Sequence, residues 1–164
     1  SLTAHAYLAK GADMNAMLEK VSSKNKAILG EIHERVKTEG LLVQLEYFAD
    51  EANNHGFKVT KAQIREVLTD IVNTFPDLTM EPLEVVAEGD WVVARYWFTG
   101  THKGMAIHPY VHYGLLVGVQ PTNKMMRVQH IHMFRFENGK IVEHQATRDD
   151  VAMVQQLGLS LTVA

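Results

Sequence analysis

Residues 125–158 read MMRVQHIHMFRFENGKIVEHQATRDDVAMVQQLG. The pair Asn138-Gly139 lies between two runs that are rich in β-branched and aromatic residues. Type I′ turns need positive φ at both central positions, which Asn and Gly tolerate, so this pattern is a strong β-hairpin signal. The sequence therefore predicts two antiparallel strands joined by a two-residue turn, with Glu137 paired to Lys140.

The two-residue turn also predicts the register of the hairpin, because each further step moves one residue along both strands. Three pairs follow: His132 with Gln145, His130 with Thr147, and Val128 with Asp149. Side chains two apart share a face of the sheet. One face should therefore carry Val128, His130, His132, Gln145, Thr147 and Asp149, and the other should carry Arg127, Gln129, Ile131, Met133, Arg135 and Arg148. A face with two imidazoles and a carboxylate suits a pocket wall better than a hydrophobic core.

Helical periodicity dominates the chain before these strands. Residues 11–38 carry apolar side chains at spacings of three, four and seven, which predicts a helix that Gly40 ends and in which Gly30 is a candidate break. Residues 41–53 are predicted as a second helix, followed by the turn signal of residues 53–56.

A third helix is predicted after Thr60. Thr60 and Gln63 have the spacing of a capping box, and Pro76 should end the helix. Beyond Pro76 the pattern changes to strand-like runs, at residues 83–87, 91–101, 111–119, 125–136 and 141–148. Helices followed by consecutive strands predict an α+β fold, in which three helices precede a curved antiparallel sheet and a short helix follows it. No linker composition divides the chain, so we expect one domain over 1–164, with 1–25 as an N-terminal helical extension.

The end of the quoted stretch resembles a known family. Asp149 followed by DVAMVQQLG is similar to the ending of the SnoaL-like polyketide cyclases, in which a strand-borne Asp precedes a short helix that finishes in Gln-Leu-Gly. Other pieces resemble that family in the same order, at residues 49–56, 75–78, 88–90, 100–104 and 138–141. The resemblance covers most of the chain from about Lys26 onward. It implies a nuclear-transport-factor-2-like cone, in which the sheet curls around a pocket, and a homodimer that pairs through the outer sheet face.

Asp149 is the first candidate catalytic residue. Apolar surroundings make a carboxylate easier to protonate, as general acid/base catalysis needs. The resemblance matches Asp149, rather than Asp150, to the family's catalytic acid/base. The residues alone leave open a second reading, in which either aspartate only caps the final helix.

His130 is the second candidate catalytic residue, because it lies diagonal to Asp149 on the predicted face and matches an active-site histidine of the family. The substrate contacts that we expect are His132, Thr147, Gln145, Val128, His55 and Trp97. His55 matches a family histidine at the mouth of the cone, and Trp97 belongs to an alternating aromatic strand, one face of which should point inward. Where the cyclases carry a second histidine and a glutamine, this chain has Thr147 and Val128, which lowers the polarity of the predicted pocket.

A metal site is the alternative chemistry. Six of the nine histidines lie between His102 and His144, and His130-x-His132 followed by Glu137 has the spacing of a cupin ligand set. Glu137 would lie at the hairpin turn, however, and a jelly roll would not begin with mostly helical residues. We therefore expect neither a metal nor another cofactor.

Composition narrows the class of partner. The net charge of −3 does not favour nucleic acid or an anionic membrane surface, and the absence of cysteine excludes disulfides. We expect a cytoplasmic protein. Because the first residue is Ser rather than Met, removal of a targeting segment is the alternative.

Two functions follow from these observations. The first is a cofactor-free enzyme in which Asp149 removes a proton α to a carbonyl of a small, largely apolar ligand and His130 stabilises the enolate. The resemblance implies that the ligand is polyketide-like and that the enolate then closes a ring by an intramolecular aldol reaction. The second is a non-catalytic protein that keeps the same fold and binds a small ligand; Thr147 and Val128 favour it.

Overall fold

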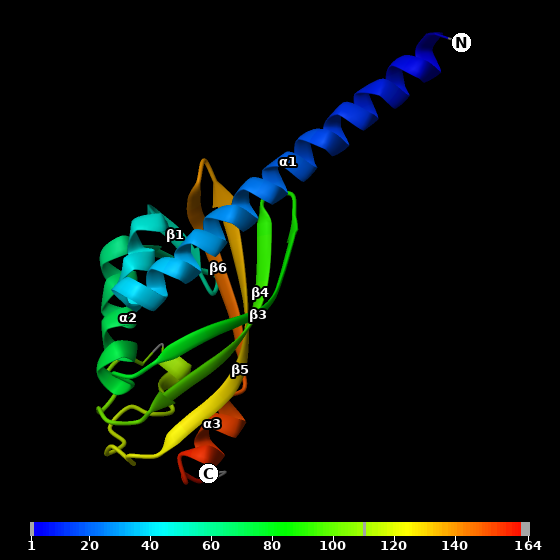
Figure 1. The fold of residues 1–164 in the computed structure, drawn as a ribbon. Helices are drawn as coiled ribbons and strands as arrows, with labels where there is room; N and C mark the ends of the chain where they lie inside the picture. Colours follow the sequence, from blue (N-terminus) through cyan, green and yellow to red (C-terminus); the bar gives the residue numbers. More distant parts are fainter. Residues whose placement is uncertain (1, 110, 162–164) are drawn as a thin grey trace.

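The computed structural model describes residues 2–109 and 111–161 of the chain. In chain order the elements are α1 (Leu2–Glu39), η1 (Leu41–Tyr47), β1 (Phe48–Asn54), β2 (Phe57–Thr60), α2 (Lys61–Thr74), β3 (Thr79–Glu88), β4 (Trp91–Thr101), η2 (Val111–Gly114), β5 (Met125–Glu137), β6 (Lys140–Arg148) and α3 (Asp150–Gln156). The C-terminal half of α1 and the whole of α2 cover one face of a curved sheet, and the N-terminal half of α1 projects beyond it (Figure 1). The predicted α+β class is confirmed. Within the described residues no helix combines the length and the apolar character that a membrane span requires.

The sheet has six strands in the order β2-β1-β6-β5-β4-β3. Every neighbouring pair is antiparallel except β1 and β6, which run parallel. The predicted antiparallel sheet is therefore confirmed except at this one pair.

The predicted second helix is replaced by η1 and β1. Its apolar residues Leu42, Leu45 and Phe48 are spaced by three, which suits the three residues per turn of a 3-10 helix as well as an α-helix. A hairpin then joins β1 to β2 through His55 and Gly56, whose φ values of 52° and 85° resemble those of Asn138 and Gly139, 50° and 78°. Two strands thus precede α2, and the predicted order of three helices before the sheet is corrected.

The predicted strand at residues 111–119 is also wrong. The segment forms η2 and turns, and only Val117 makes an isolated bridge, to Ala106. Positive φ at His112, Gly114 and Gly118 breaks the extended conformation. Other predicted boundaries are confirmed: Thr60 and Gln63 form the capping box of α2, which ends before Pro76. The candidate break at Gly30 is absent, because α1 runs through this residue without interruption.

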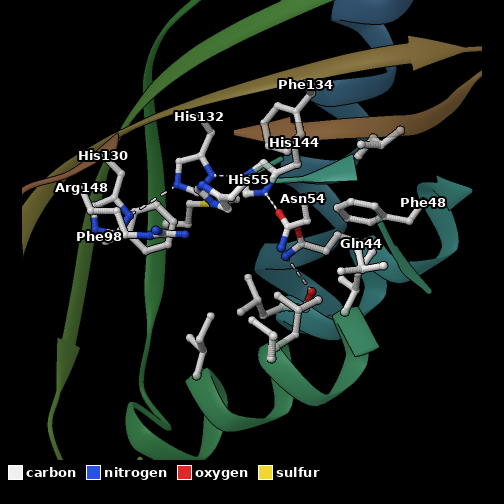
Figure 2. A pocket seen from close by; sticks show the side chains of 18 of the residues that line it. Gln44, Phe48, Asn54, His55, Phe98, His130, His132, Phe134, His144 and Arg148 are labelled. Carbon is white, nitrogen blue, oxygen red and sulfur yellow. Dashed lines mark hydrogen bonds between the residues drawn. The ribbon is translucent and has the colours of Figure 1, made fainter. Parts of the chain in front are cut away.

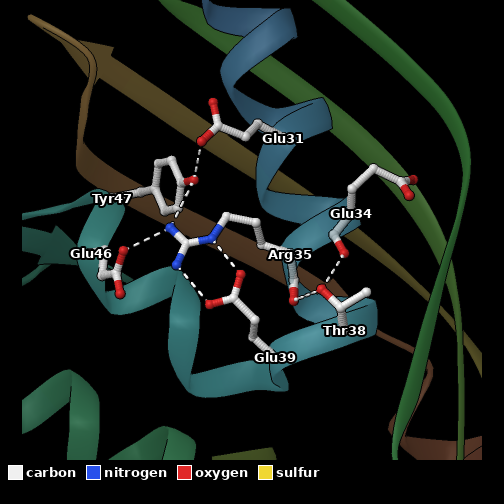
Figure 3. Close-up of polar contacts among 7 residues, drawn as sticks. All are labelled: Glu31, Glu34, Arg35, Thr38, Glu39, Glu46 and Tyr47. Atoms are coloured by element: carbon white, nitrogen blue, oxygen red, sulfur yellow. Dashed lines mark hydrogen bonds and ion pairs between the residues drawn. The ribbon is translucent and has the colours of Figure 1, made fainter.

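Polar contacts attach the end of α1 to η1 (Figure 3). Arg35 binds both carboxylate oxygens of Glu39, at 2.7 and 2.8 Å, and donates to Glu46 at 2.7 Å. Tyr47 donates its hydroxyl hydrogen to Glu31 at 2.5 Å. These contacts join the two segments on either side of the turn at Gly40.

The register of β5 and β6 decides which side chains face the helices. Glu137 pairs with Lys140 as predicted, and Phe136 pairs with Ile141. A bulge follows, because Arg135 pairs with Glu143 and leaves Val142 as an extra residue on β6. From there the pairs are shifted by one, so that His132 faces Ala146 and His130 faces Arg148.

Candidate active site

A cavity of about 540 Å³ lies between the inner face of the sheet and the helices. Apolar side chains form much of its wall, among them Phe48, Phe75, Phe98, Phe134 and Met126. Seven of the nine histidines also line it: His33, His55, His108, His112, His130, His132 and His144. A cavity of this size has room for a small organic molecule, and its wall combines apolar surface with hydrogen-bonding groups.

The β-bulge at Val142 determines what β6 contributes to the cavity. Because a shift of one residue exchanges the two faces of a strand, His144 and Arg148 face inward. Gln145 and Thr147 pair with Met133 and Ile131, which lie on the outer face. The predicted pocket positions of Gln145 and Thr147, and the predicted outer position of Arg148, were therefore wrong.

Three histidines form a hydrogen-bonded row on the cavity wall (Figure 2). Nδ1 of His144 lies 2.8 Å from Oδ1 of Asn54, and Nε2 of His144 lies 2.9 Å from Nδ1 of His132. Nε2 of His132 lies 3.4 Å from Nδ1 of His130. Nε2 of His130 ends the row, buried and without a hydrogen-bond partner among the described residues.

Burial keeps the row uncharged. It lowers the pKa of His130 to about 2 and the pKa of His144 to about 3, and it holds the pKa of His132 well below its usual range. The positive charge of Arg148 acts in the same direction on all three. Each ring is therefore neutral near pH 7 and has one N–H donor and one lone-pair acceptor.

Aromatic rings fix the planes of these histidines. Phe98 stacks on His130, with ring centroids 4.1 Å apart and planes 20° apart. Phe134 stacks on His144 at 5.0 Å, and Tyr96 meets the edge of His132 at 5.3 Å. Such contacts restrict rotation of the imidazoles, so the nitrogen atoms keep defined directions in the cavity.

A fourth histidine, His112, lies next to the row and is hydrogen-bonded to a carboxylate. Nδ1 of His112 lies 2.6 Å from Oδ1 of Asp150, and both side chains are largely buried. The ring of His112 meets that of His130 edge to face, with centroids 6.1 Å apart. Because a carboxylate oxygen accepts hydrogen bonds, Nδ1 of His112 donates in this contact, and Nε2 is the ring nitrogen left for a ligand.

A fifth histidine, His33, forms a buried pair with a tyrosine on the helical side of the cavity. Nε2 of His33, on α1, lies 2.7 Å from the hydroxyl oxygen of Tyr96, on β4. Burial lowers the pKa of His33 to about 4 and raises the pKa of Tyr96 above its usual range. Both groups are therefore neutral near pH 7, and the pair adds polarity to the wall without adding charge.

Asp149 lies outside the cavity. Its carboxylate accepts a hydrogen bond from the backbone N–H of Ala152 at 3.0 Å and caps α3, while the side chain is exposed. The capping alternative thus describes its position, and the pairing with Val128 was wrong because of the bulge. It is Asp150, the first residue of α3, that points toward the histidines.

The remaining predicted contacts divide into two groups. His130, His132 and His55 line the cavity as expected. Val128 is buried in the hydrophobic core, and Trp97 lies on the outer face of β4, where the Arg127 guanidinium is 4.3 Å from its ring centre. The inward aromatic residues of β4 are Tyr96 and Phe98, so the alternation was right but the choice of Trp97 was wrong.

The histidines do not converge on one point. Among the described residues, no three His, Asp or Glu side chains are arranged to hold a metal ion. Glu137, the third residue of the cupin-like alternative, lies at the β5–β6 turn and pairs with Lys140. His144, His132 and His130 instead form hydrogen bonds to one another in series.

Comparison of the sequence with known proteins identifies the family of the chain. The SnoaL-like polyketide cyclase profile matches residues 33–157. The chain is 30% identical over 79 residues to the aklanonic acid methyl ester cyclase AcmA of Streptomyces galilaeus, covering 48% of each protein. It is 29% identical over 79 residues to the nogalonic acid methyl ester cyclase of Streptomyces nogalater, covering 48% of this chain and 52% of that one. The matched segment thus spans about half the length of these curated relatives.

Solved structures share the fold. AclR of Streptomyces galilaeus, proposed to be a hydroxylase, superposes with a TM-score of 0.68 at 25% identity, over 87% of this chain and 86% of its own. A SnoaL-like polyketide cyclase of Agrobacterium tumefaciens superposes with a TM-score of 0.64 at 21% identity, over 80% of this chain and 95% of its own.

The curved sheet, the helices on one of its faces and the short C-terminal helix define the SnoaL-like, nuclear-transport-factor-2-like fold. The chain belongs to the SnoaL-like polyketide cyclase family. A cyclase and a protein proposed to be a hydroxylase share this architecture, so the chemistry has to be argued from the residues of the cavity.

Proposed function

We propose that the chain catalyses an acid/base ring closure of a small polyketide-like carbonyl compound in this cavity. The observation that carries the proposal is the pair of His112 and Asp150, which presents a carboxylate-held imidazole to the same apolar cavity as His130. A histidine oriented in this way is a common general acid/base. The names of the two cyclase relatives support the substrate class.

The proposed reaction is an isomerisation. Nε2 of His112 takes a proton from the carbon α to a carbonyl, and the resulting enolate carbon bonds to a second carbonyl carbon of the same molecule. The new alkoxide oxygen then recovers the proton from His112. One C–C bond forms, no atom is lost, and no electron acceptor is needed.

The surroundings suit such a reaction. The guanidinium of Arg148 lies near enough to depress the pKa of His130 and His132, so its charge also reaches an enolate formed beside them. Aromatic walls at Phe98 and Phe134 exclude water from the ligand and pack against its flat rings. His130 borders the same space and orients the ligand through Nε2.

This proposal replaces Asp149 with Asp150 as the carboxylate of the reaction. Asp149 is exposed and occupied as a helix cap, whereas Asp150 is buried against His112. The two are adjacent in sequence, so a resemblance in spacing alone does not separate them. The hydrogen bond of Asp150 to His112 supports the choice.

A non-catalytic ligand-binding function remains the competing hypothesis. Its sequence argument rested on Thr147 and Val128 in the pocket, and neither residue lines the cavity. The apolar wall and the uncharged histidines would equally suit a protein that only holds a ligand. Turnover therefore has to be measured directly.

The test uses the compounds that the relatives' names supply. The purified chain is incubated with aklanonic acid methyl ester and with nogalonic acid methyl ester. The products are separated by chromatography, and their masses are measured by mass spectrometry. Ring closure gives a product of unchanged mass and altered retention. Asp150→Asn should lower kcat by a factor of about 10² to 10⁴, whereas Asp149→Asn, which keeps a good capping residue, should retain it.

Two results would contradict the proposal. Binding of these esters without any isomer would favour the non-catalytic function. Loss of turnover in Asp149→Asn with retention in Asp150→Asn would return the catalytic role to Asp149. Circular dichroism of each variant checks that the fold is intact.

A further inference from the structure

The hydrogen bonds along the row of histidines all run in one direction, from donor to acceptor. Oδ1 of Asn54 accepts hydrogen bonds but does not donate them, so Nδ1 of His144 carries the proton across their 2.8 Å contact. Nε2 of the neutral His144 is then an acceptor, and Nδ1 of His132 must donate to it across 2.9 Å. The same reasoning across 3.4 Å assigns the proton of His130 to Nδ1.

The last nitrogen of the row is therefore a bare acceptor. Nε2 of His130 is left with a lone pair and has no hydrogen-bond partner among the described residues, although the side chain is only 3% exposed. A buried polar atom that is left unsatisfied costs free energy, which a ligand with a matching donor recovers. A ligand with only carbonyl or ether oxygens at this point cannot satisfy it.

The dipoles of the three rings add along the row. Arg148 is the cross-strand partner of His130, and Figure 2 shows it at the His130 end of the row. Three imidazoles that all carry the proton on Nδ1 have aligned dipoles, with the negative end at Nε2 of His130.

We propose that Asn54, through His144 and His132, fixes the tautomer of His130, so that the ligand of this cavity presents an enolic or phenolic hydroxyl to Nε2 of His130. The inference deepens the proposed function and rests on its assignment of the cavity as the ligand site. It also makes Asn54, His144 and His132 positioning residues, since they act through His130. The expected enolate-stabilising donor role of His130 is replaced by the role of an acceptor.

The first experiment reads the tautomers directly. Long-range ¹H–¹⁵N correlation spectra of the ¹⁵N-histidine-labelled protein distinguish Nδ1–H from Nε2–H in each ring. We expect Nδ1–H in His130, His132 and His144 at pH 7. Asn54→Asp, which keeps an acceptor at the end of the row, should leave this pattern unchanged, whereas Asn54→Leu should give mixed tautomers. An Nε2–H signal for His130 in the unmodified protein would overturn the proposal.

The second experiment reads the ligand preference. 2-Naphthol and 2-methoxynaphthalene share a ring system and differ in the hydroxyl hydrogen, and their binding is compared by calorimetry. The hydrogen bond to Nε2 should make 2-naphthol bind about fivefold more tightly. The preference should vanish in His130→Phe, which keeps a ring to stack on Phe98. Equal binding to the unmodified protein would contradict the proposal.

A fourth variant, His144→Phe, keeps the proposal testable if Asn54→Leu does not fold. His144→Phe interrupts the row one ring later and keeps a ring against Phe134. It should give mixed tautomers in His130 and a smaller preference for 2-naphthol, and an unchanged tautomer and preference would contradict the positioning role. Neither measurement uses turnover, so a failure of the cyclase assay and a failure of this inference are distinguishable.

Discussion

The carboxylate of Asp150 accepts a hydrogen bond from Nδ1 of His112 at 2.6 Å, although 38 residues separate them in the chain. Its neighbour Asp149 instead binds the backbone N–H of Ala152. The start of α3 thus uses two adjacent carboxylates for two purposes: one caps the helix and the other holds an imidazole at the cavity. The two roles lead to different results on substitution.

Asp149→Ala should lower the free energy of unfolding by about 1 kcal/mol, because the cap of α3 is lost. Asp149→Asn should stay close to the unmodified protein, since asparagine caps about as well as aspartate. Urea denaturation of the three proteins measures the difference. An equal loss in both variants would mean that the charge of Asp149, rather than its capping hydrogen bond, stabilises the fold.

The unfolding free energy should fall as the pH is lowered from 7 to 5. His130, His132 and His144 have folded-state pKa values far below 6.5, so within this window the unfolded chain binds protons that the folded chain does not. The contribution of these neutral histidines to the unfolding free energy is fully present above the pKa of the unfolded chain, and it is lost as the pH falls toward their pKa values in the folded chain. Each histidine contributes at most about 1.4 kcal/mol per pH unit.

Urea denaturation at pH 7, 6 and 5 tests this dependence. His144→Phe removes one of the three groups and should give a shallower slope. A level unfolding free energy across the window would show that the row accepts protons in the folded state. The window avoids the carboxylates with lowered pKa, such as Asp77, which titrate at lower pH.

Gly104→Ala should destabilise the fold, whereas Gly30→Ala should stabilise it. A Cβ at residue 104 would lie 2.0 Å from the backbone oxygen of Asn73, which cannot move without disturbing the end of α2. A Cβ at residue 30 meets nothing within 4 Å, and alanine in an exposed helix interior is favoured over glycine by about 0.8–1 kcal/mol. Thermal unfolding should move the two midpoints in opposite directions; a shared direction would contradict the packing at residue 104.

We expect two copies of the chain to pair through the outer face of the sheet. Val86, Ile131 and Met133 expose 62%, 45% and 39% of their surface there, which leaves an apolar patch. Sedimentation analysis should give a dimer at micromolar concentration and a monomer for the double variant Ile131→Glu, Met133→Glu. Val151→Glu, at an equally exposed apolar residue of α3, is the control and should stay dimeric.

The sequence predicted the local features of the fold well. The Asn138-Gly139 turn, the capping box at Thr60 and the alternation along residues 91–101 each depend on neighbours within a few residues, and all three are confirmed. The inward positions of His130 and His132 followed from the same alternation.

The site was harder to predict because it depends on distant contacts. The bulge at Val142 has no glycine to mark it, yet it moves His144 and Arg148 inward and Thr147 outward. Asn54 joins the histidine row only through the parallel pairing of β1 with β6, and His112 meets Asp150 only after the chain has folded. For His112 and His144, the sequence signal was the concentration of six histidines between His102 and His144.

The bulge also bears on how β6 tolerates changes in length. Val142 and Glu143 together oppose Arg135, so loss of the codon for Val142 would leave Ile141 and His144 with their present partners and facing the cavity. Loss of a codon between residues 145 and 147 would break the alternation and exchange the buried and exposed side chains of part of the strand. Homologous strands that differ by one residue should therefore be aligned with the gap at position 142.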